Sequence, residues 1–370
     1  MEKSDVKILL SIIAVLSVFY LIPKGSVWFE SSFLSGISML QDYARLHVIT
    51  CLIPALFIAG AISVFIKKES VLKYLGSRSK KPLAYAFASI SGAILAVCSC
   101  TILPIFAGIR KRGAGLGPAV TFLFSGPAIN IAAMFLTISV LGAKIGAARI
   151  IFSIAISIIV GITMALIFRE NKDAGEIFLE KGKEIPLKKS VLIPFFLSLV
   201  LILVVNGLQI GKTLKYSIIA FLVIFITLIS SFKFRKETRN EWINESWGFA
   251  KTILPILFFG VFIAGFLMPL IPEKLIENLV GGDTLIGNLT ASVFGAFMYF
   301  STLTEIPIMQ ALIAKGMANG PALALLLSGP ALSLPSMLAL QKIMGARKTS
   351  VYVLLVIAYS TAAGLIFGMI

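Results

Sequence analysis

The sequence GPAVTFLFSGPAIN at residues 117–130 returns, little changed, as GPALALLLSGPALS at residues 320–333. The similarity extends without a gap over residues 92–143 and 295–346, where 17 of 52 aligned positions are identical at a constant offset of 203. The shared residues are rich in Gly and Pro, which interrupt or redirect helices. A duplicated set of helix breakers in an apolar chain indicates a transporter made of two related halves around a central site.

The composition is that of a membrane protein. Of the 370 residues, 58% are hydrophobic and 14% are charged, and the mean hydropathy is +0.99. Runs of about 20 apolar residues recur along the whole chain. The net charge of +16 comes from Lys and Arg in short loops between these runs, so membrane topology explains it better than nucleic-acid binding. No small-residue cleavage site follows the first run, which we expect to be a retained helix.

The loop charges favour one topology. The apolar runs lie at residues 8–23, 44–66, 83–109, 117–141, 149–168, 190–206, 214–231, 252–271, 287–313, 320–341 and 349–369, with substantial polar loops expected only at 169–189 and 232–250. If every run crosses, the 33 Lys and Arg residues divide almost evenly between the two sides. If 83–109 and 287–313 are re-entrant hairpins and the N-terminus is cytoplasmic, 25 lie inside and 8 outside, as the positive-inside rule requires.

The predicted fold is therefore an all-α polytopic membrane protein with about nine full spans plus two hairpins. Five crossings separate the two copies, so we expect an inverted repeat with two re-entrant hairpins and two broken helices, in the plasma (inner) membrane. The expected organisation is an N-terminal helix and outer loop (1–43), a first repeat (44–168), connecting helices and cytoplasmic loops (169–251) and a second repeat (252–370).

The helix breakers also predict where a substrate binds. Non-helical backbone inside a bilayer is tolerated only where protein or a watery cavity satisfies its hydrogen bonds. Helix ends freed at such breaks present partial charges near the membrane midplane. We expect the site where the two hairpin tips meet the two helices broken at Ser-Gly-Pro. Its candidate residues are Cys98, Ser99, Cys100, Thr101, Ser125, Asn130, Ser301, Thr302, Thr304, Glu305, Ser328 and Ser333.

Cys98 and Cys100 form a Cys-x-Cys pair at the first tip. On a continuous helix their side chains would diverge by about 200°, whereas at a turned tip both can face one side. Thiolates favour thiophilic species, so the pair could ligate a metalloid, and no other metal site is expected. Alternatively, both are small residues that allow close packing. The second copy has Ser301 and Leu303 there, so any thiol function belongs to one half.

Glu305 is an acid within an apolar run, at a position where the first copy has Ile102. An intramembrane carboxylate is costly unless it is protonated, paired or in a wet cavity, so its default interpretation is functional. We expect Glu305 to couple transport to a proton or to orient the substrate. The alternative is a structural role, as a helix cap or as the partner of a base.

The sequence contains no Walker, His-Glu-x-x-His, Gly-x-Ser-x-Gly or Cys-x-x-Cys motif, so neither an enzyme nor a cofactor is expected. The expected partners are a small-molecule substrate and the lipid bilayer, without nucleic acid. A homo-oligomer stays open.

The ordered motifs at residues 98–104, at Gly113, at Gly117-Pro118 and at residues 125–130 resemble those of the ArsP-like predicted permease family. The resemblance covers roughly residues 44–168 and 248–368. It implies a plasma-membrane permease. Some members export trivalent organoarsenicals, which bind thiols, and this would give Cys98 and Cys100 a role.

Three functional hypotheses follow. The first is a secondary transporter that exports a soft, thiol-reactive solute such as a trivalent organoarsenical. The second is a small-anion transporter that uses helix N-termini and hydroxyl groups, with incidental cysteines. The third is a membrane thiol oxidoreductase, which the missing Cys-x-x-Cys motif disfavours.

Overall fold

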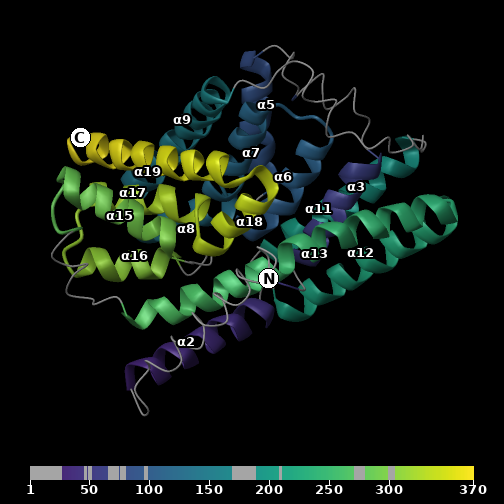
Figure 1. Ribbon diagram of the computed structural model, residues 1–370, viewed down its shortest axis with the longest axis horizontal. Coiled ribbons are helices and arrows are strands. Elements are labelled where there is room, and N and C mark those ends of the chain that lie inside the picture. Colours follow the sequence, from purple (N-terminus) through teal and green to yellow (C-terminus); the bar gives the residue numbers. More distant parts are fainter. Residues whose placement is uncertain are drawn as a thin grey trace, which may run out of the picture.

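The protein is helical throughout its described part. The computed structural model describes residues 27–45, 48, 52–65, 75, 81–95, 99–168, 189–207, 211–270, 280–298 and 305–370, and no β-strand occurs in these ranges. The helices (Figure 1) are α2 (Val27–Tyr43), α3 (Ile53–Phe65), α5 (Lys81–Leu95), α6 (Ser99–Lys111), α7 (Leu116–Ala128), α8 (Ile131–Leu141), α9 (Ala143–Ile167), α11 (Lys189–Gly207), α12 (Lys212–Lys233), α13 (Lys236–Leu267), η2 (Met268–Leu270), α15 (Leu285–Phe297), α16 (Glu305–Ala314), α17 (Asn319–Ala331), α18 (Leu334–Met344) and α19 (Ala346–Gly368). The all-α prediction is confirmed for these residues. The expected helix at 8–23 and most of the expected loop at 169–189 lie outside them.

The sequence repeat is also a repeat of backbone conformation. Helices α17 and α18 begin and end 203 residues after α7 and α8. The glycines that follow α6 and α8 have positive φ, as do their counterparts in the second copy: Gly113 (91°), Gly142 (93°), Gly316 (101°) and Gly345 (85°). Only glycine adopts this conformation without strain. The shared glycines therefore set the same two turns in each half.

Both Ser-Gly-Pro runs precede a break in the helix. Pro127 lies inside α7, which ends at Ala128, and α8 begins at Ile131. The corresponding pair, α17 and α18, is bent by 47°. Proline removes an amide donor and disturbs the turn before it, and each helix ends one residue after its proline. The predicted breaks are present, slightly farther along the chain than the motif itself.

The prediction of a polar loop at residues 232–250 is wrong for most of that range. Helix α13 begins at Lys236 and continues without a break to Leu267. Its polar first half buries Thr238, Trp242, Ser246 and Ala250, which lie four residues apart and so share one face. The spacing of the small and aromatic residues, rather than the average polarity, determines the structure here.

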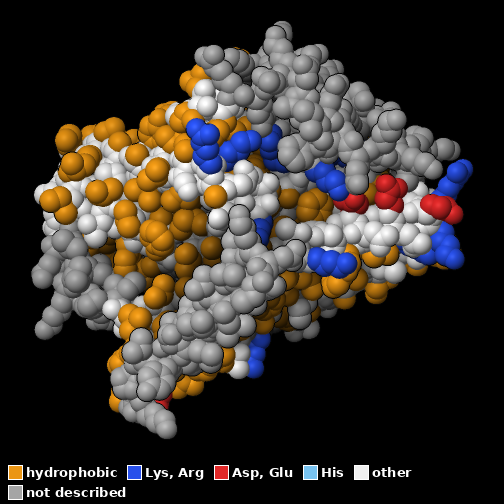
Figure 2. All heavy atoms as spheres, in the orientation of Figure 1, with side chains coloured by type: hydrophobic (Ala, Val, Ile, Leu, Met, Phe, Trp, Pro, Cys, Tyr) orange, Lys and Arg blue, Asp and Glu red, His pale blue; other side chains and the backbone are white. Residues whose placement is uncertain are grey.

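Several helices are long and apolar enough to cross a membrane. Among the described residues these are α9, α12, α13 and α19, and the bent pair α17 and α18 makes a fifth if it counts as one span. Figure 2 shows apolar side chains over much of the surface, while charged side chains of both signs gather at the end where α12 meets α13. The described part of the chain is thus built for a lipid environment with a charged end.

Helices α7 and α17 form the centre of the molecule. All 13 residues of α7 are buried, as are Gly320–Ala331 of α17. Helix α7 packs against α5 and α9, and α17 packs in the same way against α15 and α19. Helices α7 and α17 also contact each other. The two repeats therefore meet along their broken helices.

Glycine pairs allow close helix crossings in both repeats. A Cβ on Gly117 of α7 would lie 3.0 Å from the carbonyl oxygen of Gly161 on α9. In the second repeat, a Cβ on Gly320 would lie 2.6 Å from the carbonyl oxygen of Gly364 on α19. Small residues that let helix backbones approach are typical of membrane interfaces. These crossings hold each broken helix against its long neighbour.

We expect Gly320→Ala to lower the melting temperature of the purified protein in detergent. The added methyl meets backbone that cannot move aside, which costs about 1–3 kcal/mol. Gly248→Ala is the matched control, because a Cβ at this helical glycine would meet nothing within 4 Å. Alanine should leave the melting temperature unchanged there, or raise it through better helix propensity. Equal effects of the two substitutions would contradict the close crossing.

Candidate functional site

The structure describes only part of the two expected hairpin tips. Cys98, Ser301, Thr302 and Thr304 lie outside the described residues. Cys100 is placed by its backbone alone, in the first turn of α6, between half-buried Ser99 and buried Thr101. The side-chain geometry of the expected thiol pair is therefore not part of the described site.

The second half of each broken helix begins with a side-chain cap. The Oδ1 atom of Asn130 accepts a hydrogen bond from the amide of Ala133 at 3.4 Å. At the equivalent position, Ser333 Oγ accepts one from the amide of Ser336 at 3.3 Å. Caps satisfy amides that a helix start leaves free. Asn130 and Ser333, both expected at the site, thus lie at the breaks and stabilise them.

Ser125 and Ser328 are fully buried. Their Oγ atoms donate to the carbonyls of Phe122 at 3.3 Å and Leu325 at 3.4 Å, three residues earlier in the same helix. Ser125 also lies 3.4 Å from the carbonyl of Ala88 on α5. In this conformation both hydroxyls therefore serve helix packing beside the breaks.

The two repeats exchange contacts around the breaks. Helix α6, which follows the first tip, packs against α18, the second half of the other repeat's broken helix. Helix α16, which follows the second tip, packs against α8 in the same way. Each repeat thus places the helix that follows its tip on the broken helix of the other. The sequence predicted a site where the two tips meet the two broken helices, and of the tips only residues 99–104 and 305–307 are described.

A buried ion pair joins the repeats at this junction. Glu305 is the first residue of α16, and its Oε2 lies 3.2 Å from Nη2 of Arg149 on α9. The two side chains are 1% and 0% exposed. Nη1 of Arg149 also donates to Thr137 Oγ1 on α8 at 2.9 Å. One carboxylate and one guanidinium therefore connect three helices and both halves of the chain.

Among the described residues, the ion pair leaves one donor and one acceptor without a partner. Nε of Arg149 and Oε1 of Glu305 are buried and have no hydrogen-bond partner among the described residues. Buried charges require nearly complete hydrogen bonding before their attraction offsets the loss of hydration. An incompletely satisfied pair is thus a poor device for stability alone, and it retains a donor and an acceptor for a further ligand or proton.

Arg149 is absent from the predicted site because it is the first residue of the apolar run 149–168, where a cation resembles a loop charge. The residue instead lies within α9, seven positions after Gly142, where the turn ends. The sequence did carry a signal, since residues 150–168 continue as an apolar run after it. A cation inside a span is a functional candidate by the same argument that selected Glu305.

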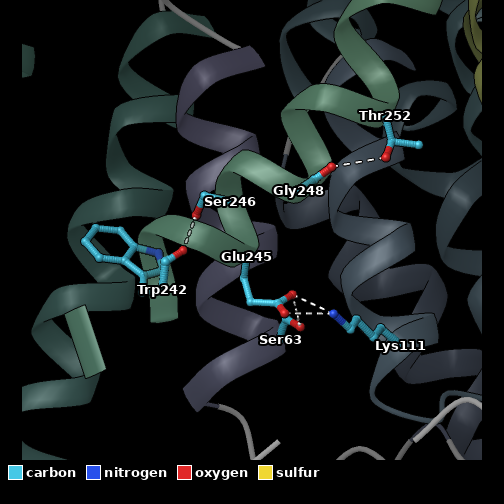
Figure 3. Close-up of polar contacts among 7 residues, drawn as sticks. All are labelled: Ser63, Lys111, Trp242, Glu245, Ser246, Gly248 and Thr252. Carbon is cyan, nitrogen blue, oxygen red and sulfur yellow. Dashed lines mark hydrogen bonds and ion pairs between the residues drawn. The ribbon is translucent and has the colours of Figure 1, made fainter. Parts of the chain in front are cut away.

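A second, more exposed ion pair anchors the far end of α6 (Figure 3). Nζ of Lys111 lies 2.7 Å from Oε2 of Glu245 on α13, and this oxygen also accepts a hydrogen bond from Ser63 on α3 at 3.1 Å. The side chains of the ion pair are 43% and 30% exposed, so it adds little stability. Beside it, a cavity of about 320 Å³ is lined by Ala107, Arg110, Lys111, Phe249, Thr252, Ile253 and Ile343.

The described residues contain no group of three or more His, Cys, Asp or Glu side chains that could hold a metal ion. The described site offers an ion pair and hydrogen bonds. The thiols of Cys98 and Cys100 are not among the described side chains.

Comparisons with known proteins find a matching family model and similar sequences. A family model described as a predicted permease (ArsP type) matches residues 33–369. The UPF0718 protein MJ0584 of Methanocaldococcus jannaschii is 40% identical over 348 residues, which are 90% of this chain and 95% of the relative. The UPF0718 protein YraQ of Escherichia coli is 23% identical over 309 residues, which are 81% and 72% of the two chains. No solved structure matches the chain.

We expect Arg149→Gln to destabilise the protein by about 3–5 kcal/mol, because it leaves the Glu305 carboxylate buried without a cation. The double variant Arg149→Gln/Glu305→Gln should recover most of this loss, since two amides can bond to each other. Thermal unfolding of the purified variants in detergent measures both effects. Additive losses in the double variant would show that the two side chains do not interact.

Proposed function

Since this chain belongs to the predicted permease family, we propose that it is a secondary transporter that exports a soft, thiol-reactive small solute such as a trivalent organoarsenical. The chain is a multi-pass membrane protein of a permease family, and the proposal adds the substrate and the direction of transport.

The observation that supports a transporter is the reciprocal packing of α6 on α18 and of α16 on α8. This arrangement supports a single site shared by two repeats that can rock against each other.

The proposed topology has nine spans and two re-entrant hairpins, a cytoplasmic N-terminus and an inverted second repeat in the plasma membrane. The lengths of the tip-flanking helices support it. Helices α5 and α6 have 15 and 13 residues, or about 22 and 20 Å, and neither alone spans a hydrocarbon core of about 30 Å. Both ends of this unit carry positive residues, Lys80-Lys81 and Arg110-Lys111-Arg112, as a hairpin that returns to the cytoplasmic side should.

The proposed substrate contacts are the thiols of Cys98 and Cys100, with the polar residues of both tips and both breaks around them. A trivalent arsenical exchanges hydroxyl ligands for thiolates, and two thiols close together bind it better than one. Glu305 would then couple transport to a proton. Its place on the helix that follows the second tip supports this assignment.

The alternative function is transport of a small anion with incidental cysteines. The specific observation in its favour is the fully buried guanidinium of Arg149 beside α8 and α16. A buried Arg is well suited to oxyanions because its donors form a planar fork.

Purified protein in proteoliposomes should move methylarsenite, and Cys98→Ser or Cys100→Ser should reduce the rate at least about tenfold, the equivalent of one lost ligand interaction of about 1.4 kcal/mol. Cys51→Ser is the matched control and should transport at the rate of the unaltered protein. Equal rates in the Cys98→Ser/Cys100→Ser double variant would remove the thiol site. Movement of phosphate or sulfate by the same double variant would favour the alternative.

The topology predicts which positions face the outside of the cell. In a cysteine-free background, Gly211→Cys should react with an impermeant maleimide added to intact cells, because the start of α12 is assigned to the outer side. Lys236→Cys should react only after permeabilisation. Both residues are exposed, so burial would not prevent labelling. The reverse pattern would overturn the proposed orientation, and labelling of both in intact cells would overturn the number of crossings between them.

A further inference from the structure

The buried ion pair breaks the symmetry of the repeat. The positions equivalent to Arg149, Thr137 and Glu305 in the opposite copies are Tyr352, Leu340 and Ile102. Tyr352 is buried like Arg149, but its hydroxyl lies 3.4 Å from the carbonyl of Ala331 at the end of α17. A neutral side chain thus occupies the same place in the fold. The charge of Arg149 is not needed to fill that space.

The described helices packed around the pair carry no other acid. Helices α5, α7, α8, α17 and α19 pack against α9, and α8 and α17 also pack against α16; none of them has an Asp or Glu. Their cations and other titratable groups are Lys81, Tyr85, Arg347, Lys348, Tyr352 and Tyr359. On α9 itself the only other cation is Lys144, which is exposed and donates to the carbonyl of Ile370. Arg149 therefore relies on Glu305 for its counter-charge. If Glu305 becomes neutral, another anion must take its place.

We propose that Arg149 is an anion-binding residue, and that one anionic group replaces the Glu305 carboxylate on the guanidinium while Glu305 takes up one proton. This inference rests on the proposed function as a secondary transporter and names the coupled ligands of its site. The contact between Nη2 and Oε2 breaks, the anion accepts the freed hydrogen bond, and a proton from solvent binds the carboxylate of Glu305. The fitting ligand is a small oxyanion or carboxylate.

Charge balance supports a coupled exchange of this kind. Before it, the site holds one cation and one carboxylate. After it, the site holds the same cation, one bound anion of single charge and a neutral acid. The net charge of the buried site is zero in both states, so neither state leaves an uncompensated charge within the membrane. An anion without the proton, or a proton without the anion, would leave such a charge.

The exchange also has a mechanical consequence. The ion pair ties α9 of the first repeat to α16 of the second. A bound anion keeps Arg149 and Thr137 together within the first repeat and releases α16. Binding would thereby loosen the contact between the two halves, which is the change that alternating access requires.

Calorimetric titration of the purified full-length protein tests this proposal. The probes are phosphate, sulfate, arsenate, methylarsonate, acetate and chloride, each at pH 6.5 in two buffers of different ionisation enthalpy. We expect at least one probe to bind with uptake of about one proton. Glu305→Gln should bind the same probe without proton uptake. The Arg149→Gln/Glu305→Gln variant, whose site is neutral and whose folding is checked by thermal unfolding, should bind it at least about 30-fold more weakly.

Tyr352→Phe is the matched control and should keep both the affinity and the proton uptake. The proposal is overturned if no probe binds, if the unaltered protein binds one without taking up a proton, or if the double glutamine variant binds as well as the unaltered protein. Persistent cysteine-dependent methylarsenite transport alongside any of these results would leave the proposed function standing and remove only the anion site.

Discussion

Backbone amides and carbonyls inside a bilayer must find partners within the protein, and this constraint shapes every part of the molecule. Two helices are broken near the centre. The second half of each is capped by the side chain of the residue just before it, Asn130 or Ser333. The breaks sit in the most buried part of the fold, between α7 and α17 and their long neighbours. Irregular backbone is thus retained where packing shields it from lipid.

The duplicated scaffold holds an asymmetric site. Turns, helix ends and glycine crossings recur at the same offset in both copies, whereas the thiols and the acid do not. Arg149 adds a third element to this asymmetry, since the other repeat has a neutral tyrosine in its place. The shared turns, helix ends and crossings give the two repeats the same framework. The residues that differ include the ion pair between Arg149 and Glu305, which lies where the two repeats meet.

The sequence predicted the repeat, the broken helices and the buried acid because each leaves a local mark, such as a shared glycine or a charge in an apolar run. It did not predict the partner of Glu305, because 156 residues separate the two and Arg149 lies close enough to a turn to resemble a loop charge. The helical first half of α13 was also missed. Its average polarity resembles that of a loop, while its burial depends on one residue in four and on helices distant in sequence.

The proposed function requires that the paired breaks line the path of the substrate. Its most direct test is the reactivity of single cysteines at Ile129 and Leu332, which follow the two Ser-Gly-Pro-Ala runs and are 8% and 0% exposed, in a cysteine-free protein reconstituted in liposomes. A small charged thiol reagent should reach each position from both sides of the membrane. Failure to react from either side, in protein that keeps the melting temperature of the cysteine-free parent, would contradict the proposed path.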